Sequence, residues 1–160
     1  MRGAQNQALG RSRGGLTTKI HMLADALGRP LRLIITPGQT GDITQAPALL
    51  EGQDGEAVLA DKAYDSNAFR EVIASMGAKA VIPSNRTRKV IIAHDAETYK
   101  QRNRIERCFN RLKHFRRFAT RYDRRAGSCS AAIDFSVAPA LAGYLISHIS
   151  ISPRELSCCI

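Results

Sequence analysis

The chain has 160 residues, which suits one domain, and its hydrophobic content of 44% is enough for a buried core and argues against global disorder. Its 24 Lys and Arg residues exceed its 14 Asp and Glu residues by ten, which favours a polyanionic partner such as nucleic acid. The apolar run from Ala131 to Ile149 contains Asp134 and Pro139, so a kinked core helix is predicted there and not a membrane span. The four cysteines have no C-x-x-C or zinc-finger spacing and are expected to be reduced thiols of a cytoplasmic protein.

The first third of the chain predicts a hairpin followed by a short helix. Residues Leu16–Asp25 and Leu31–Thr36 alternate in polarity around a turn that contains Gly and Pro, a pattern typical of two antiparallel strands. Before them, residues Met1–Arg13 are expected to be a flexible basic arm that is either frayed or in contact with phosphates. After them, Asp42 or Thr44 is expected to cap the short helix.

The middle of the chain alternates between strands and helices. Residues Ala57–Ala60 form a short apolar run of the buried-strand type, which ends at Asp61. Residues Ser66–Met76 have helical periodicity with Gly77 behind them, and Lys79–Pro83 is a further predicted strand. This order favours an α/β domain with a mixed sheet.

The segment Tyr99–Lys113 has neither Gly nor Pro and is predicted to be a long helix, capped by Asp95 and fading near Thr120. At about 100° per residue, its side chains fall into three stripes. The apolar stripe consists of Ile105, Cys108, Phe109 and Leu112. The basic stripe consists of Arg104, Arg107 and Arg111. The mixed stripe consists of Tyr99, Arg102, Glu106 and Lys113. Residues 150–160 are expected to be disordered.

The mixed stripe, Y-x-x-R-x-x-x-E-x-x-x-x-x-x-K, resembles the signature of bacterial insertion-sequence transposases of the DDE type. Residues Gly10–His21 (GRSRGGLTTKIH), Leu59–Ser66 (LADKAYDS) and Ile82–Arg86 (IPSNR) resemble the insertion-sequence-five family, in the same order. The resemblance implies an RNase H-like, retroviral-integrase-like fold over residues 14–149. It also implies a bacterial protein associated with the nucleoid.

The resemblance further implies cleavage and joining of double-stranded DNA with two Mg²⁺ ions, for which Mn²⁺ is an expected substitute. Asp61 would be the second acidic residue of the catalytic triad and Glu106 the third. Arg102 and Lys113 would contact phosphates of the element ends, and Tyr99 would position them. Further arginines would form a non-specific DNA track, namely Arg104, Arg107, Arg111, Arg116 and Arg117.

Most of these residues have an ordinary structural alternative, and Tyr99 could be a core residue at the start of the helix. Asp61 could cap a turn at the end of a strand, and Glu106 could form a helix ion pair with Arg102. The arginines could be a solvated basic face. Asp65, together with Ser66, is predicted to be a helix N-cap and not a metal ligand.

A first triad Asp is expected on a central strand before Gly10, but residues 1–9 contain no acidic side chain. Asp25 and Asp42 fall in a turn and a loop. We therefore expect the C-terminal part of a transposase catalytic domain, with negligible cleavage by this chain alone. The strands at Leu16 and Ala57 would each lack a neighbour, which predicts a marginal or aggregation-prone chain completed by an upstream fragment or by self-association.

Two alternative functions remain open. A truncated, non-catalytic DNA-binding product could regulate transposition. An unrelated basic RNA- or DNA-binding domain is disfavoured because the sequence lacks the aromatic stacking signature of an RNA-recognition motif.

Overall fold

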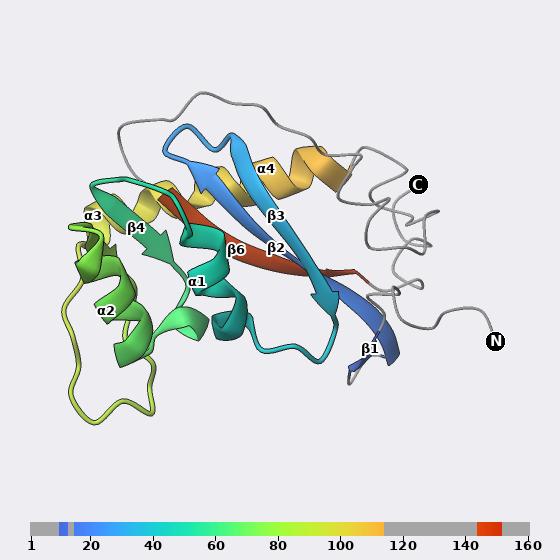
Figure 1. The fold of residues 1–160 in the computed structure, drawn as a ribbon, viewed down its shortest axis with the longest axis horizontal. Coiled ribbons are helices and arrows are strands. Elements are labelled where there is room, and N and C mark those ends of the chain that lie inside the picture. Colours follow the sequence, from blue (N-terminus) through green and yellow to red (C-terminus); the bar gives the residue numbers. More distant parts are fainter. Residues whose placement is uncertain (1–9, 13–14, 114–143, 152–160) are drawn as a thin grey trace.

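The computed structural model describes residues 10–12, 15–113 and 144–151, which form one mixed sheet with helices on both faces (Figure 1). The strands are β1 (Gly10–Ser12), β2 (Gly15–Asp25), β3 (Pro30–Pro37), β4 (Ala57–Ala60), β5 (Lys79–Val81) and β6 (Tyr144–Ile151). The α-helices are α1 (Ala46–Leu50), α2 (Asn67–Ser75), α3 (Ala96–Tyr99) and α4 (Asn103–Lys113). The 3₁₀ turns are η2 (Asp42–Gln45), η3 (Lys62–Tyr64) and η4 (Lys100–Arg102). The strand order is β1–β2–β6–β4–β5, and β3 also pairs with β2.

The predicted hairpin is confirmed as the antiparallel pair of β2 and β3. Its turn is organised by Asp25, whose Oδ1 accepts hydrogen bonds of 2.9 Å from the backbone N–H groups of Leu27 and Arg29. Gly28 has φ of 78°, and a Cβ there would lie 3.0 Å from the carbonyl oxygen of Arg104 in α4. The turn therefore needs glycine both for its left-handed backbone and for its close approach to α4.

Alternation along the strands separates two cores. Ile20, Met22 and Ala24 of β2 face α4, where they meet the buried apolar stripe of that helix. Leu23 of β2 and Ala60 of β4 face the opposite side, where α1 and α2 lie in front of the sheet in Figure 1. Because helices cover both faces, the middle strands are buried on both sides, and even His21 is fully buried.

The predicted C-terminal helix is wrong over Tyr144–Ile149, because this segment belongs to strand β6. It pairs antiparallel with β2 and parallel with β4, and in Figure 1 the red β6 runs between the blue β2 and the green β4. The segment is rich in β-branched isoleucine, which suits a strand. Its two neighbours also offer a hydrogen-bonding ladder on each side, which satisfies the backbone as well as a helix would.

The strand pairing also bears on three further expectations. The strands at Leu16 and Ala57 do not lack a neighbour, because both pair with β6. Gly10–Ser12, within the expected flexible arm, pairs with β2, and the first two residues of the expected disordered tail belong to β6. The other expectations for residues 1–9, 13–14, 114–143 and 152–160 lie outside the described part of the chain.

The helix ends follow the sequence in most places. Ser66 caps α2, since its hydroxyl accepts from the Phe69 N–H at 3.1 Å, and Gly77 ends that helix with φ of 73°. Asp95 caps α3 as predicted, although the expected long helix tightens into η4 before α4 begins. The predicted cap of the first short helix is wrong, because neither η2 nor α1 has a side-chain cap.

Candidate metal and DNA site

Asp61 lies directly after β4, at the carboxyl end of a parallel strand. Its backbone is extended and begins η3, and its side chain makes no capping hydrogen bond to that turn. The turn is closed by the backbone instead, since Tyr64 N–H donates to the Asp61 carbonyl at 2.9 Å. The structural alternative of a side-chain cap therefore does not account for the Asp61 carboxylate, which is half-buried.

Glu106 lies in the first turn of α4, shortly after Tyr99 in the chain. Burial raises the pKa of Tyr99, the negative charges of Asp61 and Glu106 raise it further, and the Arg102 guanidinium opposes them. Leu59 of β4 and Ile105 of α4 belong to one buried cluster, and Tyr99 packs against it. The strand that ends before Asp61 and the helix that carries Glu106 therefore pack together on the α4 face of the sheet.

Arg102 completes this group. Its Nη2 lies 2.5 Å from Oε1 of Glu106, and its guanidinium carbon lies 5.7 Å from the centre of the Tyr99 ring. The helix ion pair considered as an alternative for Glu106 is thus present. It leaves 54% of the Glu106 side chain exposed, so one of the two carboxylate oxygens can still serve another ligand.

The basic stripe of α4 divides into two kinds of residue. Arg107 and Arg111 are exposed, as a DNA track requires. Arg104 is half-buried and donates to the carbonyl oxygen of Ala26, which gives it a role in holding the hairpin turn. Lys113 ends α4, and its side chain lies outside the described part of the structure, as do Arg116 and Arg117.

A second polar group lies on the opposite face of the sheet, near the same edge. Lys19 Nζ donates to Asp42 Oδ1 at 2.9 Å and to the Thr40 carbonyl at 2.8 Å, so Asp42 forms an ion pair and does not cap a helix. Burial raises the pKa of Tyr64, and the charges of Asp42 and Asp61 raise it further. The turn η2, which begins at Asp42, also contacts η3, which follows Asp61.

The family model of the transposase DDE domain matches residues 2–132 of the chain. The chain belongs to this transposase family. A protein named as a transposase for insertion sequence element IS6501 of Brucella ovis is 46% identical over 111 residues, which are 68% of this chain and 85% of that relative. One named for element IS402 of Burkholderia cepacia is 34% identical over 121 residues, 68% of this chain and 55% of that relative. No solved structure matches the chain.

This membership places the transposase domain in DNA transposition, as the sequence analysis predicted. Among the described residues, no helix is long and apolar enough to cross a membrane. Within the same residues, no group of three or more His, Cys, Asp or Glu side chains is placed to share a metal ion.

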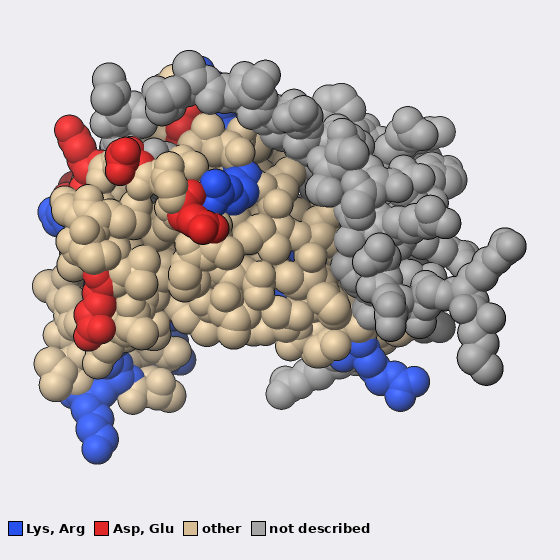
Figure 2. Space-filling model, viewed as in Figure 1, with Lys and Arg blue, Asp and Glu red and all other residues tan. Residues whose placement is uncertain are grey.

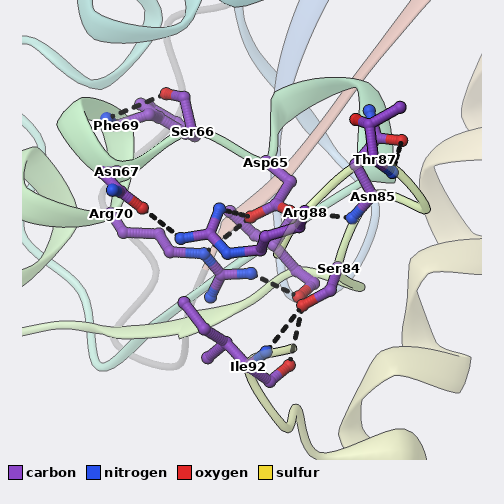
Figure 3. A network of polar contacts seen from close by, with 11 residues as sticks. Asp65, Ser66, Asn67, Phe69, Arg70, Ser84, Asn85, Thr87, Arg88 and Ile92 are labelled. Carbon is purple, nitrogen blue, oxygen red and sulfur yellow. Dashed lines mark hydrogen bonds and ion pairs between the residues drawn. The ribbon is translucent and has the colours of Figure 1, made fainter. Parts of the chain in front are cut away.

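Sequence reasoning missed a buried carboxylate of the transposase domain that binds two arginines. Asp65 is not an N-cap: its fully buried carboxylate binds Arg70 Nε at 2.9 Å and Arg88 Nη1 at 3.0 Å (Figure 3). It also accepts from the Asn85 N–H at 2.8 Å. Burial, the largest single influence, raises the pKa of Asp65, but these three donors together hold that pKa below its ordinary value. The members of this network are up to 23 positions apart, so no local pattern predicts it. The only sequence signal is the presence of arginines in the segment that follows Asp65.

Replacing Asp65 with Asn is expected to lower the free energy of unfolding by about 3 kcal/mol, because Arg70 and Arg88 lose their shared counter-charge. Since the pKa of Asp65 is lower in the folded state, its stabilisation is complete above about pH 4 and is lost as the pH falls through the folded-state value. Urea unfolding from neutral to acidic pH measures both effects. The exposed Asp54→Asn is the control, and equal stability of the two variants at neutral pH would contradict the expectation.

Proposed function

We propose that this domain takes part in Mg²⁺-assisted cleavage and joining of insertion-sequence DNA, with Asp61 and Glu106 as the metal-binding carboxylates. The observation that carries the proposal is the packing of β4 against α4 through Leu59 and Ile105, because Asp61 follows that strand and Glu106 follows Ile105 in that helix. Strand ends in open α/β sheets are where ligands commonly bind.

The two residues fit a magnesium ion. Mg²⁺ prefers oxygen ligands and is commonly held by one or two carboxylates together with water and substrate phosphates. Asp61 and Glu106 are both accessible, and they would hold Mg²⁺, or Mn²⁺ in its place. When bound, the metal would supply charge stabilisation at the phosphodiester. Arg102 holds the Glu106 carboxylate in position from the same helix.

DNA would be held by the arginines and the tyrosine around this pair. Arg102 is available for a phosphate through the donors that Glu106 leaves unused, and its guanidinium can bind phosphate with two hydrogen bonds. Tyr99 lies against that guanidinium and would orient it. Arg107 and Arg111 would follow the DNA backbone, and Lys113 is proposed as a further phosphate contact on the strength of its spacing alone.

The sheet supports an RNase H-like assignment. The resemblance places a central strand between the strands at Leu16 and Ala57, and β6 lies there, antiparallel to β2 and parallel to β4. An upstream fragment is thus not needed to complete the sheet. The proposal of such a partner, or of self-association, now rests on the composition of β6, since this central strand contains no Asp or Glu.

The same strand favours a second candidate function. A central strand without a carboxylate suits a DNA-binding product that regulates transposition without cutting. The two functions share the DNA-binding residues and differ at the metal site. Binding of Mn²⁺ to Asp61 and Glu106 would favour the first, and binding of DNA without any metal dependence would favour the second.

The test combines Mn²⁺ binding, followed by electron paramagnetic resonance, with nicking of supercoiled plasmid in Mg²⁺. We expect saturable Mn²⁺ binding to the purified chain, duplex binding, and negligible nicking because the central strand β6 carries no carboxylate. A chain that binds duplex but no Mn²⁺ would replace the first function by the second. Robust nicking that depends on Mg²⁺ would show that two carboxylates are sufficient.

A further inference from the structure

The loop between β5 and α3 has an unusual composition for an exposed segment. Residues 83–94 contain Arg86, Arg88 and Lys89 and no acidic residue. Arg86 and Lys89 are exposed, and next to them Val90 and Ile91 expose 73% and 80% of their surface. They are adjacent and are the two most exposed of the large hydrophobic residues that the structure describes.

We propose that the central part of this loop, residues 85–91, is a preformed DNA-binding clamp beside the carboxylate pair. Arg86 and Lys89 bind phosphates of the duplex, and Val90 and Ile91 pack against the sugars and base edges of the adjoining groove. The inference rests on the proposed function, since it names the surface that holds the DNA whose phosphodiester meets Asp61 and Glu106.

The loop is held at its base by hydrogen bonds and ion pairs. Ser84 and Ile92 close the base, because Ile92 N–H donates to Ser84 Oγ at 2.9 Å and that hydroxyl donates back to the Ile92 carbonyl at 3.0 Å (Figure 3). Within the loop, Asn85 and Arg88 are fastened to the buried Asp65. A surface fixed before binding loses little conformational entropy when the ligand arrives.

The network also leaves the loop with a favourable charge for DNA. The one carboxylate of Asp65 faces both Arg70 and Arg88, so the base of the loop keeps one positive charge in excess. Arg86 and Lys89 add two more at the tip. In Figure 2, Lys and Arg side chains project at the lower left of the molecule, where Figure 1 places the tip of this loop.

The loop lies at the edge of the sheet that carries the candidate site. β4 and β5 are parallel, so Asp61 after β4 and the loop after β5 leave the sheet at the same edge. Asp65, which fastens the loop, lies only four positions after Asp61. The loop then leads into α3 and Tyr99. A duplex on the loop therefore lies next to the carboxylate pair.

An apolar pair on its own would equally suit a protein partner. The flanking charges decide for DNA, because a protein surface would have to supply carboxylates for three cations, whereas every phosphate of a duplex is an anion. Apolar side chains that reach into a groove are a known mode of contact with base steps and sugars.

The experiment measures binding of the full chain to a duplex by fluorescence anisotropy, without metal, over a range of salt concentrations. Arg86→Gln with Lys89→Gln is expected to weaken binding about tenfold or more and to reduce the salt slope by about 1.8, the value for two phosphates. Val90→Ser with Ile91→Ser is expected to weaken binding while leaving the salt slope unchanged.

Two matched controls accompany these variants. Lys79→Gln with Lys100→Gln removes two exposed lysines that already lie beside carboxylates, and Leu16→Ser with Leu27→Ser removes two exposed apolar residues elsewhere. Both are expected to bind like the parent chain. Loop variants that bind as tightly as the controls would overturn the clamp. If the loop binds a protein instead, neither loop variant is expected to lose duplex binding.

The outcome is separable from that of the proposed function. If the loop variants lose DNA binding while substitution of Asp61 and Glu106 leaves Mn²⁺ binding unchanged, the clamp is upheld and the metal site is overturned. Unchanged DNA binding in the loop variants, together with Mn²⁺ binding that depends on both carboxylates, would do the reverse.

Discussion

Asp61→Asn and Glu106→Gln are each expected to weaken Mn²⁺ binding by about 100-fold or more, while duplex binding without metal persists. The reason is that each substitution removes one of only two acidic ligands, and changes even to the partners of a metal ligand commonly cost 10- to 100-fold. Electron paramagnetic resonance of free Mn²⁺ measures the affinity. The double variant is expected to lose little more than either single variant, since the two residues act as one site.

Two exposed carboxylates provide the controls. Asp54→Asn and Glu71→Gln make the same chemical changes at positions away from the site, and both are expected to keep the parent affinity. A second readout needs no metal: removal of either site carboxylate is expected to lower the pKa of Tyr99, because each one raises it now. Variants that match their controls in both measurements would show that Asp61 and Glu106 do not form a site.

Ile146→Ala is expected to lower the free energy of unfolding by about 3 kcal/mol, the usual cost of a cavity left by a large aliphatic side chain. Ile146 is fully buried in β6 and packs in the core that β2 and β4 share with α1 and α2. Urea unfolding followed by circular dichroism measures the change. Ile91→Ala, the same substitution at an 80% exposed residue, is expected to stay within about 0.5 kcal/mol of the parent chain.

A double-mutant cycle tests the strand register as well. Leu23 and Ile146 are cross-strand partners in the same core. Residues in contact usually show a coupling energy of about 0.5 kcal/mol or more, whereas distant residues are additive. Strictly additive effects of Leu23→Ala and Ile146→Ala would place the segment somewhere other than beside β2.

Local signals predicted the local structure well. The alternation of Leu16–Asp25, the capping positions of Ser66 and Asp95, and the apolar stripe around Ile105 all appear in the fold as expected. Each depends on residues within a few positions of one another, so the physics that decides them is visible in a short window of sequence.

The failures have a common physical cause, which is partners that are far apart in the chain. An apolar run such as Tyr144–Ile151 can be a buried helix or a buried strand. Only the backbone hydrogen-bonding groups that β2 and β4 offer at their facing edges decide for a strand. The pairing of Asp61 with Glu106 came from the resemblance, because no spacing rule joins residues 45 positions apart (106 minus 61). The Asp65 network was likewise invisible, because Arg88 joins it from another loop.

β6 lies in the middle of the sheet but is made after the strands that it pairs with, so the sheet is completed late in synthesis. Asp25 and its cross-strand partner Tyr144 are separated by 119 positions (144 minus 25). At about 5–20 residues per second, a ribosome needs roughly 6–24 s to deliver the second after the first. During that interval β2, and later β4, lack the strand that will pair with them, so the emerging chain exposes unpaired sheet edges to chaperones and proteases until β6 is made.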